Sequence, residues 1–212
     1  MQAIQSIYFS VAAKIQKLDV LPLLLLRIFL APIFIMAGYG KLQLGNADAG
    51  FLQRLGPDSG TVWWFENTLN MPAPELMAFL AGWGELLGGW LLLFGLFTRL
   101  SSLVLIVTMV VAATTAHWDK GWHALPETTL TMPWEWRGDL IDDAVNKRTK
   151  AREILKEHGN YKWLTSSGSI TVLKNGIEFA ATYALMLLVT LIYGGGRYLS
   201  LDYWLTRNRA PG

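Results

Sequence analysis

Three ionisable residues lie well inside long apolar stretches of this chain, Arg27, Glu85 and Glu178, and His117 lies near the end of another. An ionised side chain within hydrocarbon is costly unless it has a partner or faces a water-filled cavity. Groups of these types can transfer protons, form ion pairs or hold a polar ligand. We therefore treat the four as a candidate intramembrane polar pocket. No recognised catalytic constellation appears among them, so the catalytic residues stay unknown.

The depth of each group within its stretch predicts two pairs. At 1.5 Å per residue, Arg27 lies about 9 Å from the inner face and Glu85 about 15 Å from the outer face. Because an arginine side chain reaches several ångströms further, we predict an Arg27–Glu85 pair, which either lines a pocket or only fixes helix packing. Glu178 and His117 reach similar outer depths, which predicts a second polar site. The alternatives are that Glu178 pairs with Lys174 and that His117 is an interface residue without a partner.

The stretch that contains Glu85 also carries tryptophans and small residues. Trp83 and Trp90 could line an apolar pocket for a quinone, with the buried charges exchanging its protons. Gly84 and Gly88 have the small-xxx-small spacing that lets two helix backbones approach closely. We predict that this glycine pair serves helix packing.

Metal chemistry has little support in the spacing of potential ligands. His117 and His123 are six residues apart, which is not a recognised ligand spacing, and no HxxxH or MxxM cluster occurs. The chain has no cysteine, which excludes disulfides, thiolate ligation and CxxC redox chemistry. The sequence therefore predicts no dedicated metal site, and both quinone and copper stay open as cofactors.

Four apolar stretches must position these residues. The 212-residue chain is 52% hydrophobic and only 16% charged, with a mean hydropathy of +0.32, whereas soluble domains are about 25% charged. Each stretch approaches the ~20 residues needed to cross a bilayer, and the stretches run over residues 21–39, 75–97, 100–118 and 174–193. We predict an all-α integral membrane four-helix bundle that forms one domain over residues 1–212. The sequence has no nucleotide-binding loop, so no nucleotide site is predicted. It also has no basic stripe, so nucleic acid is not predicted as a partner.

The connections between the stretches predict further helices. Residues 2–18 have apolar residues at helical spacing and read as an interfacial amphipathic helix, with a secretory signal as the alternative. TVWWFENTL within residues 40–74 predicts a short interfacial helix. The long insert 119–173 contains LIDDAVNKRTKAREILKEHG, a helix that either covers the bundle or docks a partner. Lysine and arginine near both chain ends and at Arg99 place the termini in the cytoplasm and both long loops outside.

Three segments resemble the DoxX family of small four-helix membrane proteins. They are LLLLRIFLAPIFIMAGYGKL, with its arginine and its closing Gly-x-x-Lys; FLAGWGELLGGWLLLFGLFTRL, with Glu85; and IEFAATYALMLLVTLIYGGGRYLSLD, with Glu178. The third apolar stretch matches only in general character. The insert 119–173 is similar to a subgroup associated with bacterial gene sets that make copper-binding peptides.

The resemblance implies a function without fixing a reaction, since fold alone does not establish chemistry. Family members are connected to a quinone-linked thiosulfate oxidoreductase of the membrane and to protection from oxidative or thiol stress. The implied role is an accessory protein of the bacterial inner membrane in a redox or copper-stress pathway. It would act in the bilayer with membrane or periplasmic protein partners, and a homo-oligomer stays open. The alternative is a quinone-interacting oxidoreductase subunit; a small-molecule carrier is a third class, less favoured because no internal repeat is evident.

Overall fold

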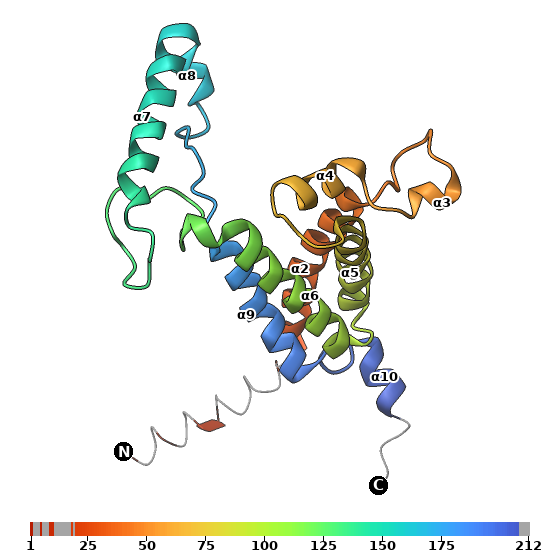
Figure 1. Cartoon of the computed structure of the whole chain (residues 1–212). Helices are drawn as coiled ribbons and strands as arrows, with labels where there is room; N and C mark the ends of the chain where they lie inside the picture. The colour runs from red at the N-terminus through yellow and green to blue at the C-terminus, as the bar shows by residue number, and fades with distance from the viewer. Residues whose placement is uncertain (2–4, 6–8, 11–17, 19, 208–212) are drawn as a thin grey trace. The chain divides into compact units, whose positions relative to one another are not determined.

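The computed structural model describes residues 1, 5, 9–10, 18 and 20–207 of the chain. Its regular structure is helical (Figure 1), and the described residues contain an isolated bridge between Leu42 and Pro57 but no sheet. The predicted all-α class is thus confirmed. The interfacial helix predicted over residues 2–18 lies almost entirely outside the described residues.

Among the described residues, three helices are long and apolar enough to cross a membrane. They are α2 (Val20–Lys41), α5 (Pro74–Phe94) and a continuous helical stretch over Thr98–Lys120. This stretch begins as α6 (Thr98–Ala112), continues as a π-helix (Ala113–His117) and ends as a 3-10 turn (Trp118–Lys120). Three of the four predicted stretches are therefore long helices.

The fourth apolar helix, α9 (Glu178–Tyr193), is shorter than predicted. Residues 174–177 were expected to begin it, but Asn175 has a left-handed φ of +65°. The backbone N–H groups of residues 174–178 donate instead to the carbonyls of Gly121, Trp122, His123 and Ala124. Because these donors are satisfied by a neighbouring loop, the helix starts four residues later than the hydropathy predicts.

Contacts divide the chain into two compact units, residues 1–108 with 183–212 and residues 109–182. In the first unit, α2 and α5 touch backbone to backbone. A Cβ atom added at Gly38 would lie 2.6 Å from the carbonyl oxygen of Gly82, and one added at Gly89 would lie 2.9 Å from the amide nitrogen of Ile35. Glycine is therefore required at both positions for this close packing.

The predicted glycine pair lies on another face of α5. A Cβ at Gly84 would lie 3.3 Å from a methyl group of Val104, and one at Gly88 would lie 3.0 Å from a methyl group of Leu105. The structure thus places both glycines against α6. Glycines on α5 therefore allow close packing against two different helices, α2 and α6.

A short C-terminal helix, α10 (Leu201–Arg207), is tied to the turn between α5 and α6. The carboxylate of Asp202 accepts the backbone N–H groups of Phe97 and Thr98 at 2.7 and 2.8 Å, and Asp202 N donates to the Gly95 carbonyl. The first N–H groups of a helix have no partner within it, so Asp202 caps α6 from a distant part of the sequence. Ser102 of α6 and Thr190 of α9 share a further buried hydrogen bond of 2.7 Å.

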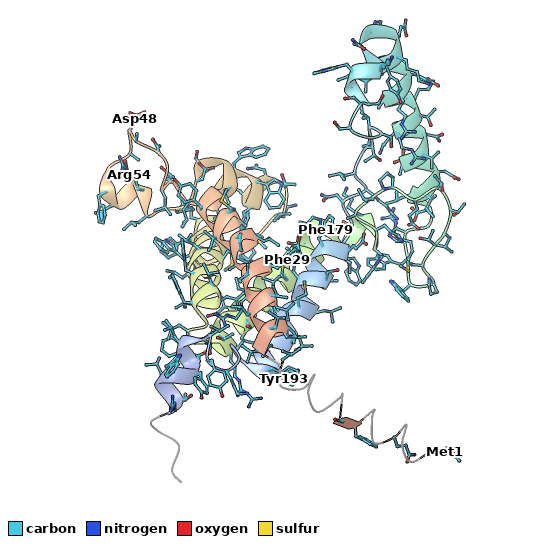
Figure 2. All side chains as sticks on the ribbon, turned by 180° about the vertical axis from the view of Figure 1, so that it is seen from behind. Met1, Phe29, Asp48, Arg54, Phe179 and Tyr193 are labelled. Carbon is cyan, nitrogen blue, oxygen red and sulfur yellow. The ribbon has the colours of Figure 1, made fainter. Side chains whose placement is uncertain are left out.

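Large apolar side chains cover the outer surfaces of the long helices (Figure 2). Phe29 of α2 is 54% exposed and Tyr193 at the end of α9 is 68% exposed. Such side chains are unfavourable in water over so wide an area. They are suited to a lipid bilayer.

The first long connection contains α3 (Phe51–Arg54) and α4 (Ser59–Asn67), and α4 is the short helix predicted over TVWWFENTL. Asp58 caps α4 by accepting the N–H groups of Gly60 and Thr61. In the second unit, α7 (Leu140–His158) confirms the predicted helix of the insert, and α8 (Tyr161–Leu164) follows it.

Candidate functional site

Arg27 is almost fully buried, at 1% exposure, and its guanidinium donates to backbone carbonyls. Nε donates to Leu92 O at 2.9 Å and Nη2 to Leu93 O at 2.8 Å, while Nη1 donates to Gly195 O at 2.6 Å and Leu199 O at 3.1 Å. The last carbonyls of a helix lack partners and carry partial negative charge. Arg27 therefore joins the end of α5 to the segment that follows α9.

Glu85 of α5 forms its ion pair with Lys41, the last residue of α2. The predicted Arg27–Glu85 pair is therefore wrong. The physical reason is that α2 supplies two cations at different depths. Arg27 meets carbonyls at the end of α5 and in the segment after α9, and the long stem of Lys41 reaches the buried carboxylate. The Gly-x-x-Lys sequence at the end of α2 carried the signal for this second cation.

The two tryptophans expected to line a quinone pocket have separate surroundings. Trp83 Nε1 donates to Leu55 O at 2.9 Å, and its ring packs on Phe79. Trp90 is exposed, and its ring stacks on Phe94 with 5.8 Å between centroids. The contacts of both tryptophans are thus explained by packing within the first unit.

In the second unit, the histidine that lies beside Glu178 is His123 and not the predicted His117. His117 Nδ1 lies 2.8 Å from Asn175 O, where a ring N–H can donate. Glu178 Oε2 accepts the backbone N–H of Ala124 at 2.9 Å and lies 3.8 Å from His123 Nδ1. The predicted His117–Glu178 contact is therefore wrong, because the loop after the third helix turns back along residues 174–178. The alternative Glu178–Lys174 pair is also wrong.

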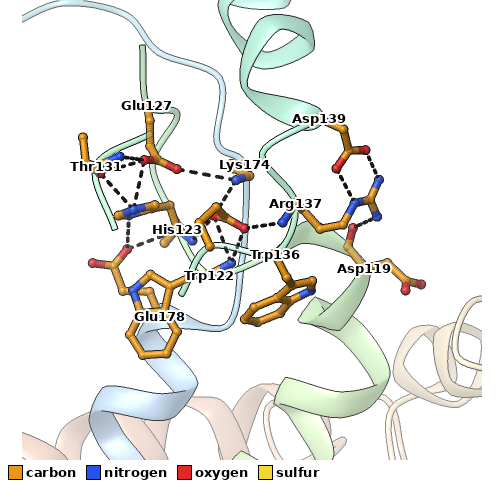
Figure 3. A network of polar contacts seen from close by, with 12 residues as sticks. Asp119, Trp122, His123, Glu127, Thr131, Trp136, Arg137, Asp139, Lys174 and Glu178 are labelled. Carbon is orange, nitrogen blue, oxygen red and sulfur yellow. Dashed lines mark hydrogen bonds and ion pairs between the residues drawn. The ribbon is translucent and has the colours of Figure 1, made fainter. Parts of the chain in front are cut away.

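Four buried polar residues gather near Glu178, and we call His123, Glu127, Glu135 and Lys174 the loop cluster. Each of these four is at most 9% exposed. Figure 3 shows His123, Glu127 and Lys174 of this cluster together with Glu178. Lys174 Nζ lies 2.7 Å from Glu135 Oε2 and 3.6 Å from Glu127 Oε1, and His123 Nε2 lies 3.1 Å from Glu127 Oε2. The loop cluster thus holds a positive charge between two carboxylates.

Glu135 is the most strongly held acid of the loop cluster. Burial raises the pKa of its carboxyl, but a hydrogen bond from Lys174 and backbone N–H groups of Arg137, Trp122 and His123 outweigh that effect and lower the pKa to about 2. The backbone donors lie 2.8 to 3.3 Å from the carboxylate oxygens. Glu135 is therefore ionised at any physiological pH, and its hydrogen bonds hold the backbone at residues 122 and 137 close to each other.

One potential metal-ligand atom from each of His123, Glu127 and Glu135 lies within 4.8 Å of the others. Imidazole nitrogen with carboxylate oxygen is a donor set that divalent metal ions accept. The sequence pattern did not predict that these residues lie together, because their spacing matches no ligand motif and Lys174 lies 39 residues beyond Glu135. The sequence carried one local signal for this cluster, which is the position of Glu127 four residues after His123.

Comparison with known proteins identifies the membrane part of the chain. The family model DoxX matches residues 22–118, which run from α2 to the end of the third long helix. No curated protein and no solved structure gives a significant match. The loop cluster and α9 lie outside the matched residues. The chain therefore has long apolar helices suited to a lipid bilayer, and its residues 22–118 match the DoxX family model.

Proposed function

We propose that this protein is an accessory component of the bacterial inner membrane in a redox or copper-stress pathway, acting with partner proteins. In this proposal α9 is the fourth span of a four-helix bundle, and the whole chain is one functional domain. The observation that carries the proposal is the location of the loop cluster. Buried ionisable groups gather in the connecting segment between the third and fourth apolar helices, outside the matched family domain.

The charged groups of α2 and α5 support an accessory role better than a catalytic one. A site that exchanges protons with a quinone needs an ionisable group directed at the ligand. Arg27 instead donates its hydrogen bonds to four carbonyls, and Glu85 is paired with Lys41. Both arrangements stabilise helix packing, so the quinone-interacting subunit remains the second choice.

The second unit offers surface for a partner. Trp163 of α8 is 71% exposed and Ile154 of α7 is 57% exposed, and both belong to the insert. Exposed aromatic and aliphatic side chains on a polar helical segment are typical anchors of protein interfaces. The insert also carries the resemblance to the subgroup associated with copper-binding peptides.

A complementation experiment tests the proposal. Deletion of the gene in its native host should lower growth under copper or oxidant challenge, and the wild-type gene should restore it. Glu135→Gln should fail to restore growth, because the amide cannot hold Lys174 as a carboxylate does. Glu153→Gln is the matched control, since Glu153 pairs with Lys150 on the exposed side of α7.

Membrane levels of each variant are measured in parallel, so that lost growth is separated from lost protein. Full restoration by Glu135→Gln at the wild-type protein level would contradict the proposed role of the loop cluster. A deletion without a copper or oxidant phenotype, together with quinone bound to the purified protein, would favour the quinone-interacting subunit.

A further inference from the structure

The loop cluster has unbalanced charge. Among the described residues in contact there, Glu127 and Glu135 are both buried carboxylates, and Lys174 is the ammonium between them. Arg137 interacts electrostatically with Glu135, but its guanidinium donates its hydrogen bonds to Asp139 and to the carbonyl of Asp119. A buried charge without compensation is strongly unfavourable. An added cation would balance the cluster.

One oxygen of the cluster also lacks a hydrogen bond. Glu127 Oε1 is fully buried and accepts none, while Glu127 Oε2 accepts the hydroxyl and backbone N–H of Thr131. The nearest cation to Oε1 is Lys174 Nζ, at 3.6 Å. An open carboxylate lone pair inside a buried cluster is unusual in proteins, and the other oxygen of the same carboxylate, Oε2, lies 3.1 Å from His123 Nε2.

We propose that the loop cluster binds a divalent transition-metal ion, with His123, Glu127 and Glu135 as ligands. Their ligand atoms already lie within 4.8 Å of one another, so small side-chain shifts would converge them on one ion. The nitrogen and oxygen donors suit Zn²⁺, Mn²⁺ or Cu²⁺, whereas Cu⁺ prefers sulfur ligands. Glu178 Oε2 lies 3.8 Å from His123 Nδ1, and a small shift would let this carboxylate accept the Nδ1–H of a histidine that binds metal through Nε2.

Lys174 is the internal competitor in this site. Its ammonium bridges the two acidic ligands in the metal-free protein and takes the place of the ion's charge. Metal binding displaces the ammonium, whose flexible four-carbon stem lets it move away. This gives an unusual signature: loss of a buried positive charge that stabilises the free protein increases metal affinity.

Zn²⁺ binding to the full-length protein in detergent tests the inference, by competition with a chromogenic chelator after removal of any histidine tag. Glu127→Gln should weaken Zn²⁺ binding by about tenfold or more. Lys174→Met should strengthen it by a similar factor, because the competing charge is gone. Asp143→Asn and Lys147→Met are matched controls from an exposed ion pair on α7, and both should bind as wild type does.

Equal Zn²⁺ affinity in wild type and Glu127→Gln would overturn the inference, as would unchanged or weaker binding in a folded Lys174→Met. If Lys174→Met folds only when Zn²⁺ is present, that rescue supports the site. If it does not fold in either buffer, the comparison of wild type with Glu127→Gln decides. The inference does not depend on the proposed function, because the metal alone is the probe and no partner or pathway is needed.

Discussion

Arg27 and Glu85 lie on neighbouring helices, yet different chemistry stabilises each of them. A guanidinium has five N–H donors in a fixed plane, which suits several carbonyls at once. A carboxylate accepts hydrogen bonds and is best paired with a compact ammonium such as that of Lys41. Sequence depth alone placed the two charges together because it considered only one cation in α2. The second cation is Lys41, whose long stem reaches Glu85 from the end of α2.

A double-mutant cycle distinguishes the observed pair from the predicted one. Lys41→Met and Glu85→Gln should be non-additive in detergent unfolding, with a coupling free energy of about 1 kcal/mol or more. Arg27→Met and Glu85→Gln should be additive to within about 0.5 kcal/mol, because these residues share no partner. The exposed Asp143–Lys147 pair serves as the reference with near-zero coupling. Strong coupling between Arg27 and Glu85 would contradict the observed pairing.

The low pKa of Glu135, about 2 in the folded protein against an ordinary 4.5, gives a pH prediction. A carboxyl whose pKa is depressed by folding stabilises the folded state above its unfolded pKa, here by about 3 kcal/mol. That stabilisation is lost as pH falls from about 4.5 toward 2. The difference in unfolding free energy between wild type and Glu135→Gln should therefore be constant from about pH 5 to 7.

Below about pH 4.5 the same difference should shrink, and thermal unfolding in an acid-tolerant detergent measures it. Glu153→Gln is the control, because an exposed partner of Lys150 adds little at any pH. If the difference in unfolding free energy between wild type and Glu135→Gln stays the same at about pH 3, then Glu135 acts through packing and not through its charge.

Glycine residues allow α2 and α5 to pack closely against each other. Gly38 of α2 meets the backbone of Leu86 and Gly82, whereas a Cβ atom added at Gly40, two residues on, would have no neighbour within 4 Å. Gly38→Ala should lower unfolding stability by about 1–3 kcal/mol, because the added methyl group would force the two backbones apart. Gly40→Ala should be neutral or stabilising, because alanine favours helix over glycine by about 1 kcal/mol. Detergent melting curves of both variants make the comparison, and equal losses would contradict it.

Hydropathy was sufficient to predict the long helices but not the beginning of α9. Apolar side chains at residues 177 and beyond favour a helix, yet nothing local shows that the loop at 121–124 would bond to the backbone of residues 174–178. The same long-range contact brings Lys174 to Glu135 and moves His123 beside Glu178. The error in the helix start and the error in the outer polar site therefore have one cause. Both depend on contacts between segments far apart in the sequence, which periodicity does not report.

For the whole molecule, the proposed four spans require both chain ends on one side of the membrane. Arg99, Arg197 and Arg207 lie at that side with the α5–α6 turn, so we expect it to be cytoplasmic. Reporter fusions at Gly212 should give a cytoplasmic signal, and fusions within residues 140–150 an extracytoplasmic one. Fusions within residues 44–50 should match the latter. A cytoplasmic signal from the 140–150 fusion would overturn the four-span arrangement.

The 16 residues of α9 have a consequence for the surrounding lipid. At 1.5 Å per residue the helix covers about 24 Å, whereas the 22 residues of α2 cover about 33 Å and the hydrocarbon core about 30 Å. As a span, α9 has negative hydrophobic mismatch, so lipids beside it must shorten while those beside α2 do not. A thicker bilayer then strains the first residues of α9, where Glu178 is bonded to Ala124 and Lys174 enters the loop cluster. In the proposed four-span arrangement, acyl-chain length would therefore be a mechanical variable that acts on the geometry of the loop cluster.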